Sequence, residues 1–155
     1  MNLFKVGELV FSGQFGVGEV TGLEDMAGQE FYSIQSIENT VKVFIAVDNA
    51  GTLRVLKSKD EINDLLTTLK ETPSPRDFDS KKDRINFYKD EVKTNDPIKQ
   101  YQLLNEMHSI DDRGKSEDSA LSKQLDSLAM EIKFIFDLDL PAAQDMLLEN
   151  IKKEA

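Results

Sequence analysis

The residues of this chain that could do chemistry begin with a run of glycines. Gly16, Gly18 and Gly22 lie in the sequence GVGEVTG, and more β-forming sequence follows them. A dinucleotide loop needs the spacing G-x-G-x-x-G, a phosphate loop needs G-K-[ST], and both need a helix N-terminus to hold the phosphates. The third glycine comes one residue too late, and the sequence after it has a strand pattern. The run is therefore predicted to be structural.

A single histidine and two acidic pairs are the other candidates for catalysis or metal binding. His108 is the only histidine and cysteine is absent, so disulfides, thiol catalysis and zinc sites are excluded. His108 is predicted to cap a helix or to be half-buried. The pairs Asp111-Asp112 and Glu117-Asp118 are predicted to form a solvated face. Since no Ser-His-Asp set is present either, the sequence predicts no enzyme, metal, cofactor or small-molecule substrate.

Lys42 interrupts the strongest β-forming run of the chain, VKVFIAV at residues 41–47. The run predicts a strand, and small barrels with an exposed edge strand often bind partners by adding a strand. The lysine has two interpretations. It is either a gatekeeper that discourages edge-to-edge aggregation or a contact to an acidic partner. The residue types alone leave both open and favour the gatekeeper.

The charge of the chain argues against free-standing DNA binding. The formal net charge is −10, so the chain repels a phosphate backbone at long range. Residues 76–93 are the exception, with six basic and five acidic side chains. This balance relieves the negative field locally but does not make a basic patch.

The elements that position these residues change character at Ser58. Before it, the sequence predicts five short strands with turns between them and no helix. The predicted strands cover residues 6–11, 17–23, 30–37, 41–47 and 53–56, with turns at 25–29, 38–40 and 48–51. Five of the eight glycines lie in the first 22 residues, which suits an ordinary hairpin or the bulges of a small bent barrel. Residues 1–57 are therefore predicted to form a small antiparallel β-barrel domain.

From Ser58 on, apolar residues recur with a helical period. Ser58 to Glu61 is a capping box, and Asp96-Pro97 places an N-cap before a proline at the first helical position. Helices are predicted from 58 to before 72, from 79 or 80 to 93, from 97 through 107, from 119 to 136 and from 139 through 151, with Ile98, Tyr101, Leu104 and Met107 on the apolar face of the third. Residues 72–75 are a predicted linker and 110–118 a predicted loop. Residues 58–155 are thus a predicted all-α domain of four or five helices, which makes the chain α+β.

The composition bounds where the chain acts. Its 155 residues are 39% hydrophobic and 31% charged, which is typical of a globular chain. No apolar run approaches the roughly 18–20 residues of a membrane span, and the N-terminus has no apolar signal core. Together with the absence of cysteine, this predicts a cytoplasmic protein without membrane contact.

Several short segments, in order, resemble the CarD/CdnL-like bacterial transcription factors. Residues 4–11 (FKVGELVF) and 16–20 (GVGEV) are similar to the opening of these proteins. Residues 28–32 (GQEFY) are similar to their G-x-x-x-Y strand start, 41–50 to their m-x-V-x-V-P-x-[DE]-[NK]-A segment, and 52–54 to their G-[LV]-R. The order of barrel, linker and helical region also matches, so the resemblance covers nearly the whole chain.

The resemblance implies a Tudor-like N-terminal domain that docks on the β subunit of bacterial RNA polymerase, and a helical domain that approaches promoter DNA in that complex. Such proteins tune transcription initiation and have no catalytic activity. Lys42 matches a basic position that faces the polymerase, which raises the contact interpretation above the gatekeeper. The predicted polymerase-binding residues are Val41, Lys42, Val43 and Phe44.

The sequence departs from this family's pattern in the region that contacts DNA. DNA-contacting members carry a tryptophan followed by an Arg-Arg pair, and this chain has no tryptophan. The nearest candidates for DNA contact are Arg76, Phe78, Lys81, Lys82 and Arg84. We therefore predict weak or absent independent DNA binding. The alternative is an adaptor that kept the barrel and binds a partner other than polymerase.

Overall fold

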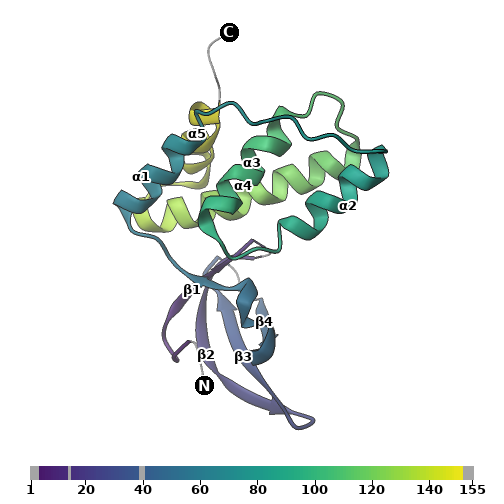
Figure 1. The fold of residues 1–155 in the computed structure, drawn as a ribbon. Coiled ribbons are helices and arrows are strands. Elements are labelled where there is room, and N and C mark those ends of the chain that lie inside the picture. Colours follow the sequence, from purple (N-terminus) through teal and green to yellow (C-terminus); the bar gives the residue numbers. More distant parts are fainter. Residues whose placement is uncertain (1–3, 14, 39–40, 152–155) are drawn as a thin grey trace.

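The chain folds as a five-stranded sheet followed by five helices in the computed structural model, which describes residues 4–13, 15–38 and 41–151 (Figure 1). The strands are β1 (Leu9–Ser12), β2 (Gly16–Met26), β3 (Gln29–Ser36), β4 (Lys42–Ala46) and β5 (Arg54–Val55), and the 3-10 helix η1 (Val47–Thr52) joins β4 to β5. The α+β prediction is confirmed. The turn predicted at 38–40 includes Asn39 and Thr40, which lie outside the described residues.

The sheet is antiparallel and open rather than a closed barrel. Its strand order is β4-β3-β2-β1-β5, so β4 and β5 are its edges and no ladder joins them within the described residues. The register of β2 against β3 shifts between Val20 and Gly22, and such a bulge bends the strand and increases its twist. The sheet is therefore bent as predicted. The prediction that it closes into a barrel is wrong, because β5 has only two residues and does not pair with β4.

The two faces of the sheet pack against different partners. The inner face and neighbouring segments form their own core, made of Phe4, Val10, Val20, Tyr32, Ile34 and Leu53. Gly18 lies on this face, where a Cβ atom would come within 2.6 Å of Ile34 Cγ2. The glycine run thus lies in β2 and allows a close approach of side chains, in agreement with the structural role predicted for it.

The helices are α1 (Lys59–Thr68), α2 (Lys81–Glu91), α3 (Pro97–Ser109), α4 (Lys115–Phe136) and α5 (Leu140–Ile151). The Ser58–Glu61 capping box and the Asp96 N-cap are both present. Two predictions are wrong. Helix α4 begins four residues before Ser119 because the Gly114 N–H donates to the carboxylate of Glu117 at 3.1 Å, which caps the helix within the predicted loop. Ile98 is 62% exposed, since it lies in the first turn of α3, before that helix enters the core.

Helix α4 links the helices to the strands, because it contacts β2 at the end of the sheet nearest to the helices (Figure 1). Phe11 of β1 and Val17 of β2 join the same hydrophobic core as α1, α3, α4 and α5. The Ser127 hydroxyl donates to the Gly13 carbonyl at 2.7 Å. The division into domains 1–57 and 58–155 stays a prediction. None of the helices in the described ranges is long and apolar enough to cross a membrane.

Candidate functional site: the β4 edge and helix α2

The backbone of β4 presents hydrogen-bonding groups at an edge of the sheet. On its inner side, the Ser36 N–H donates to the Val41 carbonyl at 3.1 Å, and Val43 lies opposite Ile34. Hydrogen-bonded pairs alternate with non-bonded pairs along an antiparallel ladder. The N–H and C=O groups of Val43 therefore point to β3, and those of Lys42 and Phe44 point away from it, toward the open edge.

The side chains of this edge are apolar and positively charged. Val41 is 55% exposed and Phe44 43% exposed. Lys42 is exposed beside them and forms no ion pair within the described residues. Val43, by contrast, is half-buried opposite Ile34. We call the four residues 41–44 the β4 edge.

An edge with these properties can accept an added strand. The backbone groups would supply hydrogen bonds, Phe44 would supply apolar contact, and Lys42 would pair with an acidic group on the partner. The other edge is less suited to this, since β5 has two residues and one of them, Arg54, is buried. The β4 edge is therefore the better candidate of the two for binding a protein.

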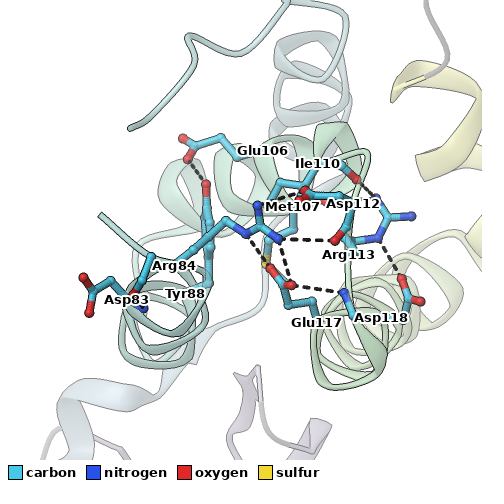
Figure 2. A network of polar contacts seen from close by, with 12 residues as sticks. Asp83, Arg84, Tyr88, Glu106, Met107, Ile110, Asp112, Arg113, Glu117 and Asp118 are labelled. Atoms are coloured by element: carbon cyan, nitrogen blue, oxygen red, sulfur yellow. Dashed lines mark hydrogen bonds and ion pairs between the residues drawn. The ribbon is translucent and has the colours of Figure 1, made fainter. Parts of the chain in front are cut away.

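The five residues predicted to contact DNA lie on α2 and on the segment before it. Figure 2 shows Arg84 reaching across to the start of α4, where it forms a bidentate ion pair with Glu117 at 2.7 and 2.9 Å. A third bond joins Arg84 to Asp112 at 2.9 Å. The side chain of Arg84 is 15% exposed, and these carboxylates raise the pKa of its guanidinium. We call this cluster of Arg84, Asp112 and Glu117 the α2 latch.

Arg76 is paired in a similar way. Its guanidinium donates to both carboxylate oxygens of Glu106, at 2.6 and 3.2 Å, and lies over the Phe87 ring at 4.9 Å. The same carboxylate accepts a hydrogen bond from the Tyr88 hydroxyl at 2.9 Å (Figure 2). Burial and this carboxylate raise the pKa of Tyr88.

The remaining three predicted residues differ from these arginines. Phe78 is half-buried and packs on Phe87 and Tyr88, with ring centroids 5.4 and 6.0 Å apart. Lys81 and Lys82 are exposed at the start of α2, and neither forms an ion pair within the described part of the chain. Of the five, they are therefore the two whose charge is open to a ligand.

Of the acidic pairs in the α3–α4 connection, Asp111, Asp112 and Asp118 are exposed as predicted, whereas Glu117 is not. Glu117 is 7% exposed and held by Arg84, and Asp118 pairs with Arg113 at 2.8 Å. Arg113 also donates to the backbone carbonyls of residues 107, 108 and 110, which fixes the connection (Figure 2). Arg84 lowers the pKa of Glu117 and of Asp112. These carboxylates hold the helices together, which the local sequence did not indicate.

The His108 side chain makes no hydrogen bond or ion pair with the residues that the structure describes. It lies at the surface in the last turn of α3. Neighbouring atoms remove part of its hydration, and this desolvation, followed by the Arg113 charge, lowers its pKa. In residues 4–13, 15–38 and 41–151, no three His, Asp or Glu side chains are grouped so that they could hold a metal ion.

A buried ion pair between the sheet and α4 was missed by the sequence reasoning. Arg54 of β5 binds both carboxylate oxygens of Glu131 at 2.7 Å, with side-chain exposures of 7% and 0%. The two residues are 77 positions apart. Glu131 falls within the period of α4, so a charged residue near an apolar stripe was the signal that could have identified it.

The fold defines a class of protein: a small antiparallel sheet with one open edge, followed by a helical region. Residues 4–57 match the family model of the CarD-like/TRCF RID domain. No curated protein matches the chain. Residues 4–57 are therefore similar to the CarD-like/TRCF RID domain, over less than half of the chain. The match ends just before α1, so it confirms the resemblance seen in the sequence for residues 4–57 and does not extend to the helices.

Proposed function

We propose that this chain is a non-enzymatic, cytoplasmic regulator of bacterial transcription that docks on the β subunit of RNA polymerase through the β4 edge. The observation that carries the proposal is the match of residues 4–57 to a polymerase-interacting family. The open edge supports it, because outward backbone groups at Lys42 and Phe44 offer hydrogen bonds that a strand of the partner would satisfy. Lys42 adds a charge without an ion pair within the described residues.

The charge of Lys42 gives the proposal a direct test. Replacing Lys42 by Glu reverses a charge at the edge, so we expect affinity for the β subunit to fall by about 1–2 kcal/mol, or roughly 5–30-fold. The fold should survive, since an exposed substitution usually changes stability by less than about 0.5 kcal/mol. Affinity is measured by titrating labelled protein with purified β subunit.

Lys70→Glu is the matched control for this titration. Lys70 is also exposed, but it lies after α1, away from the sheet edge in sequence and element. Lys70→Glu changes the net charge by the same amount as Lys42→Glu and should leave the affinity for the β subunit unchanged. A folded Lys42→Glu variant with wild-type affinity would remove Lys42 from the interface and return it to the gatekeeper role. No binding by the wild-type chain would favour an adaptor with another partner.

We further propose that the helical region contacts promoter DNA only weakly and only once polymerase holds it. Arg76 and Arg84 already satisfy carboxylates inside the protein, which leaves the exposed Lys81 and Lys82 for phosphates. Each phosphate contact contributes a salt-dependent term to the free energy of binding, so two cations on a chain of net charge −10 give little affinity. Tethering to polymerase raises the effective concentration to the millimolar range, where such contacts become occupied.

An anisotropy titration of the free chain with a promoter duplex at physiological salt tests this second step. We expect no binding at submicromolar concentration and a shallow dependence on salt. Submicromolar affinity that is lost in Lys81→Glu/Lys82→Glu would show that the negative charge of the chain does not prevent DNA binding.

A further inference from the structure

A groove between α2 and α4 is lined by apolar and basic residues, although the chain as a whole is acidic. Its volume is about 460 Å³. Apolar side chains from both helices and from the end of α3 line it: Ile85, Val92, Met107, Ile110 and Ala120. None of these residues belongs to the β4 edge, so the groove is a separate feature of the molecule.

Lysines surround this apolar lining. Lys89 and Lys93 come from α2 and the residues after it, and Lys123 comes from α4. All three are exposed. Lys93 makes one long contact with Asp90 at 3.7 Å, whereas Lys89 and Lys123 form no ion pair within the described residues. The one acidic residue among the described lining, Glu117, is neutralised by Arg84 at 2.7 Å.

Helix α2 is held by one apolar cluster and by polar contacts. Tyr88 is the one residue of this helix that is buried, and it packs with Leu103 and Met107 of α3. Its other attachments include the α2 latch and the Lys99–Glu91 ion pair at 2.7 Å. On α4, the groove is lined by the small residues Ser116 and Ala120. The apolar side chains of the groove therefore continue the cluster around Tyr88 and Met107 toward the surface.

The volume of the groove limits the size of a ligand. Gly13, which follows β1, also lines it, and a Cβ atom there would meet the Val92 carbonyl at 3.3 Å. Arg113 and Glu117 line it as well. The lining on α2 runs over eight steps from Ile85 to Lys93, or about 12 Å at 1.5 Å per residue. A helical peptide of that length and about 10 Å diameter would occupy roughly 940 Å³, well above the volume available.

We propose that this groove binds a free anionic amphiphile, a carboxylate with a medium-length hydrocarbon chain. The hydrocarbon would lie on Met107, Ile110 and Ala120, and the carboxylate would lie among Lys89, Lys93 and Lys123. Apolar walls with a few convergent charged groups are the usual composition of small-molecule sites. The bound chain would bridge α2 and α4 and so stabilise α2. The site does not depend on the polymerase proposal.

Decanoate titrated into the full chain, followed by calorimetry and by residue-resolved NMR, tests the site. We expect one decanoate per chain, with shifts centred on Met107 and Ile110, and at least fivefold weaker binding of the neutral analogue decanol. Decyltrimethylammonium, with the same chain and a positive head, should not bind. Equal affinity for decanol would overturn the proposal, as would decanoate binding only where decanoate aggregates.

Three variants localise the binding. Lys89→Glu/Lys123→Glu should weaken decanoate at least tenfold. Lys81→Glu/Lys82→Glu changes the charge by the same amount on the same helix but outside the groove, and it should bind like the wild type. Ala120→Leu fills the groove and should abolish binding while the NMR spectrum stays folded. Retained binding in folded Ala120→Leu, or equal losses in both charge variants, would contradict the site.

Anionic phospholipid vesicles separate a free amphiphile from a membrane surface. Co-sedimentation with such vesicles should be absent, because the chain carries a net charge of −10 and is repelled by an anionic surface. Co-sedimentation that depends on Lys89 and Lys123 would overturn the free-amphiphile proposal in favour of a lipid surface.

Discussion

The buried pair Arg54–Glu131 should determine much of the stability of this chain. Arg54 donates to both oxygens of Glu131 at 2.7 Å and to Gln100 Oε1 at 2.9 Å. Its guanidinium also lies 4.3 Å from the centroid of the Phe11 ring. Glu131 is fully buried and accepts one further bond, from the Lys57 N–H at 2.9 Å. Each charge therefore depends on the other for most of its compensation.

Removing one partner leaves a charge in the interior. Loss of one member of a buried pair costs about 3–5 kcal/mol, while replacing both by apolar residues of similar volume is often neutral. We therefore expect Arg54→Met and Glu131→Met each to lose about 3–5 kcal/mol of unfolding free energy. The double variant should lose only about 1–2 kcal/mol, mainly because Gln100 is left without its partner. Against a total stability of about 5–15 kcal/mol, either single loss is large.

Urea denaturation followed by circular dichroism measures all four corners of this cycle. A single variant that is already unfolded in water agrees with the expected large loss of stability, provided that the double variant is folded. Arg54→Lys is the control, because it keeps a positive charge but loses the bidentate geometry, and it should be intermediate. Losses of unfolding free energy below about 1 kcal/mol in the single variants, or losses that simply add in the double variant, would contradict the expected coupling of the two charges.

Three smaller predictions concern the helical region. The hydroxyl of Tyr101 is buried without a hydrogen-bond partner among the described residues, so Tyr101→Phe should be neutral or stabilising by about 1 kcal/mol. Tyr88→Phe loses a bond to a buried carboxylate and should cost about 1–2 kcal/mol of unfolding free energy. Thermal unfolding compares the two variants. The pKa of Glu117 is lowered in the folded chain, so its stabilising contribution is complete above the unfolded value of 4.5 and is lost as the pH falls through the lower folded value. Denaturation midpoints should therefore be constant near neutral pH and drop below about pH 4.5. Glu117→Gln should reduce that drop. Limited proteolysis should cut within residues 72–80 before it cuts within 41–47, and early cleavage in the latter would argue against the proposed domain division.

The local signals in the sequence were sufficient to predict most of the elements. The capping box at Ser58 and the Asp96-Pro97 pair act within one helical turn, so they are visible in a few consecutive residues. Alternation in residues 41–47 predicted β4. The start of α4 was missed because Gly114 is a weak N-cap by residue type, and the cap depends on the carboxylate of Glu117 three residues later.

The long-range polar contacts could not be predicted in the same way. Arg84 and Glu117 are 33 positions apart, and nothing in their local sequence indicates that they pair. The DNA-contact prediction treated Arg84 as a free cation for this reason. The sheet was predicted to close because five strands in a row are typical of a barrel, whereas β5 has only two residues and one of them, Arg54, pairs with Glu131 of α4. The strand β4 was predicted from its sequence pattern, and the strand order of the structure places it at an edge of the sheet.

Hydrogen exchange of the β4 edge, with and without the polymerase β subunit, tests the central proposal most directly. The amides of Lys42 and Phe44 point away from β3 by the alternation of the ladder, so they should exchange quickly in the free chain. An added strand would hydrogen-bond them, and we predict that their exchange slows in the complex. The amides of Val43 and Ile45 already bond to β3 and should change little. A complex in which Lys42 and Phe44 exchange as fast as in the free chain would contradict docking by this edge.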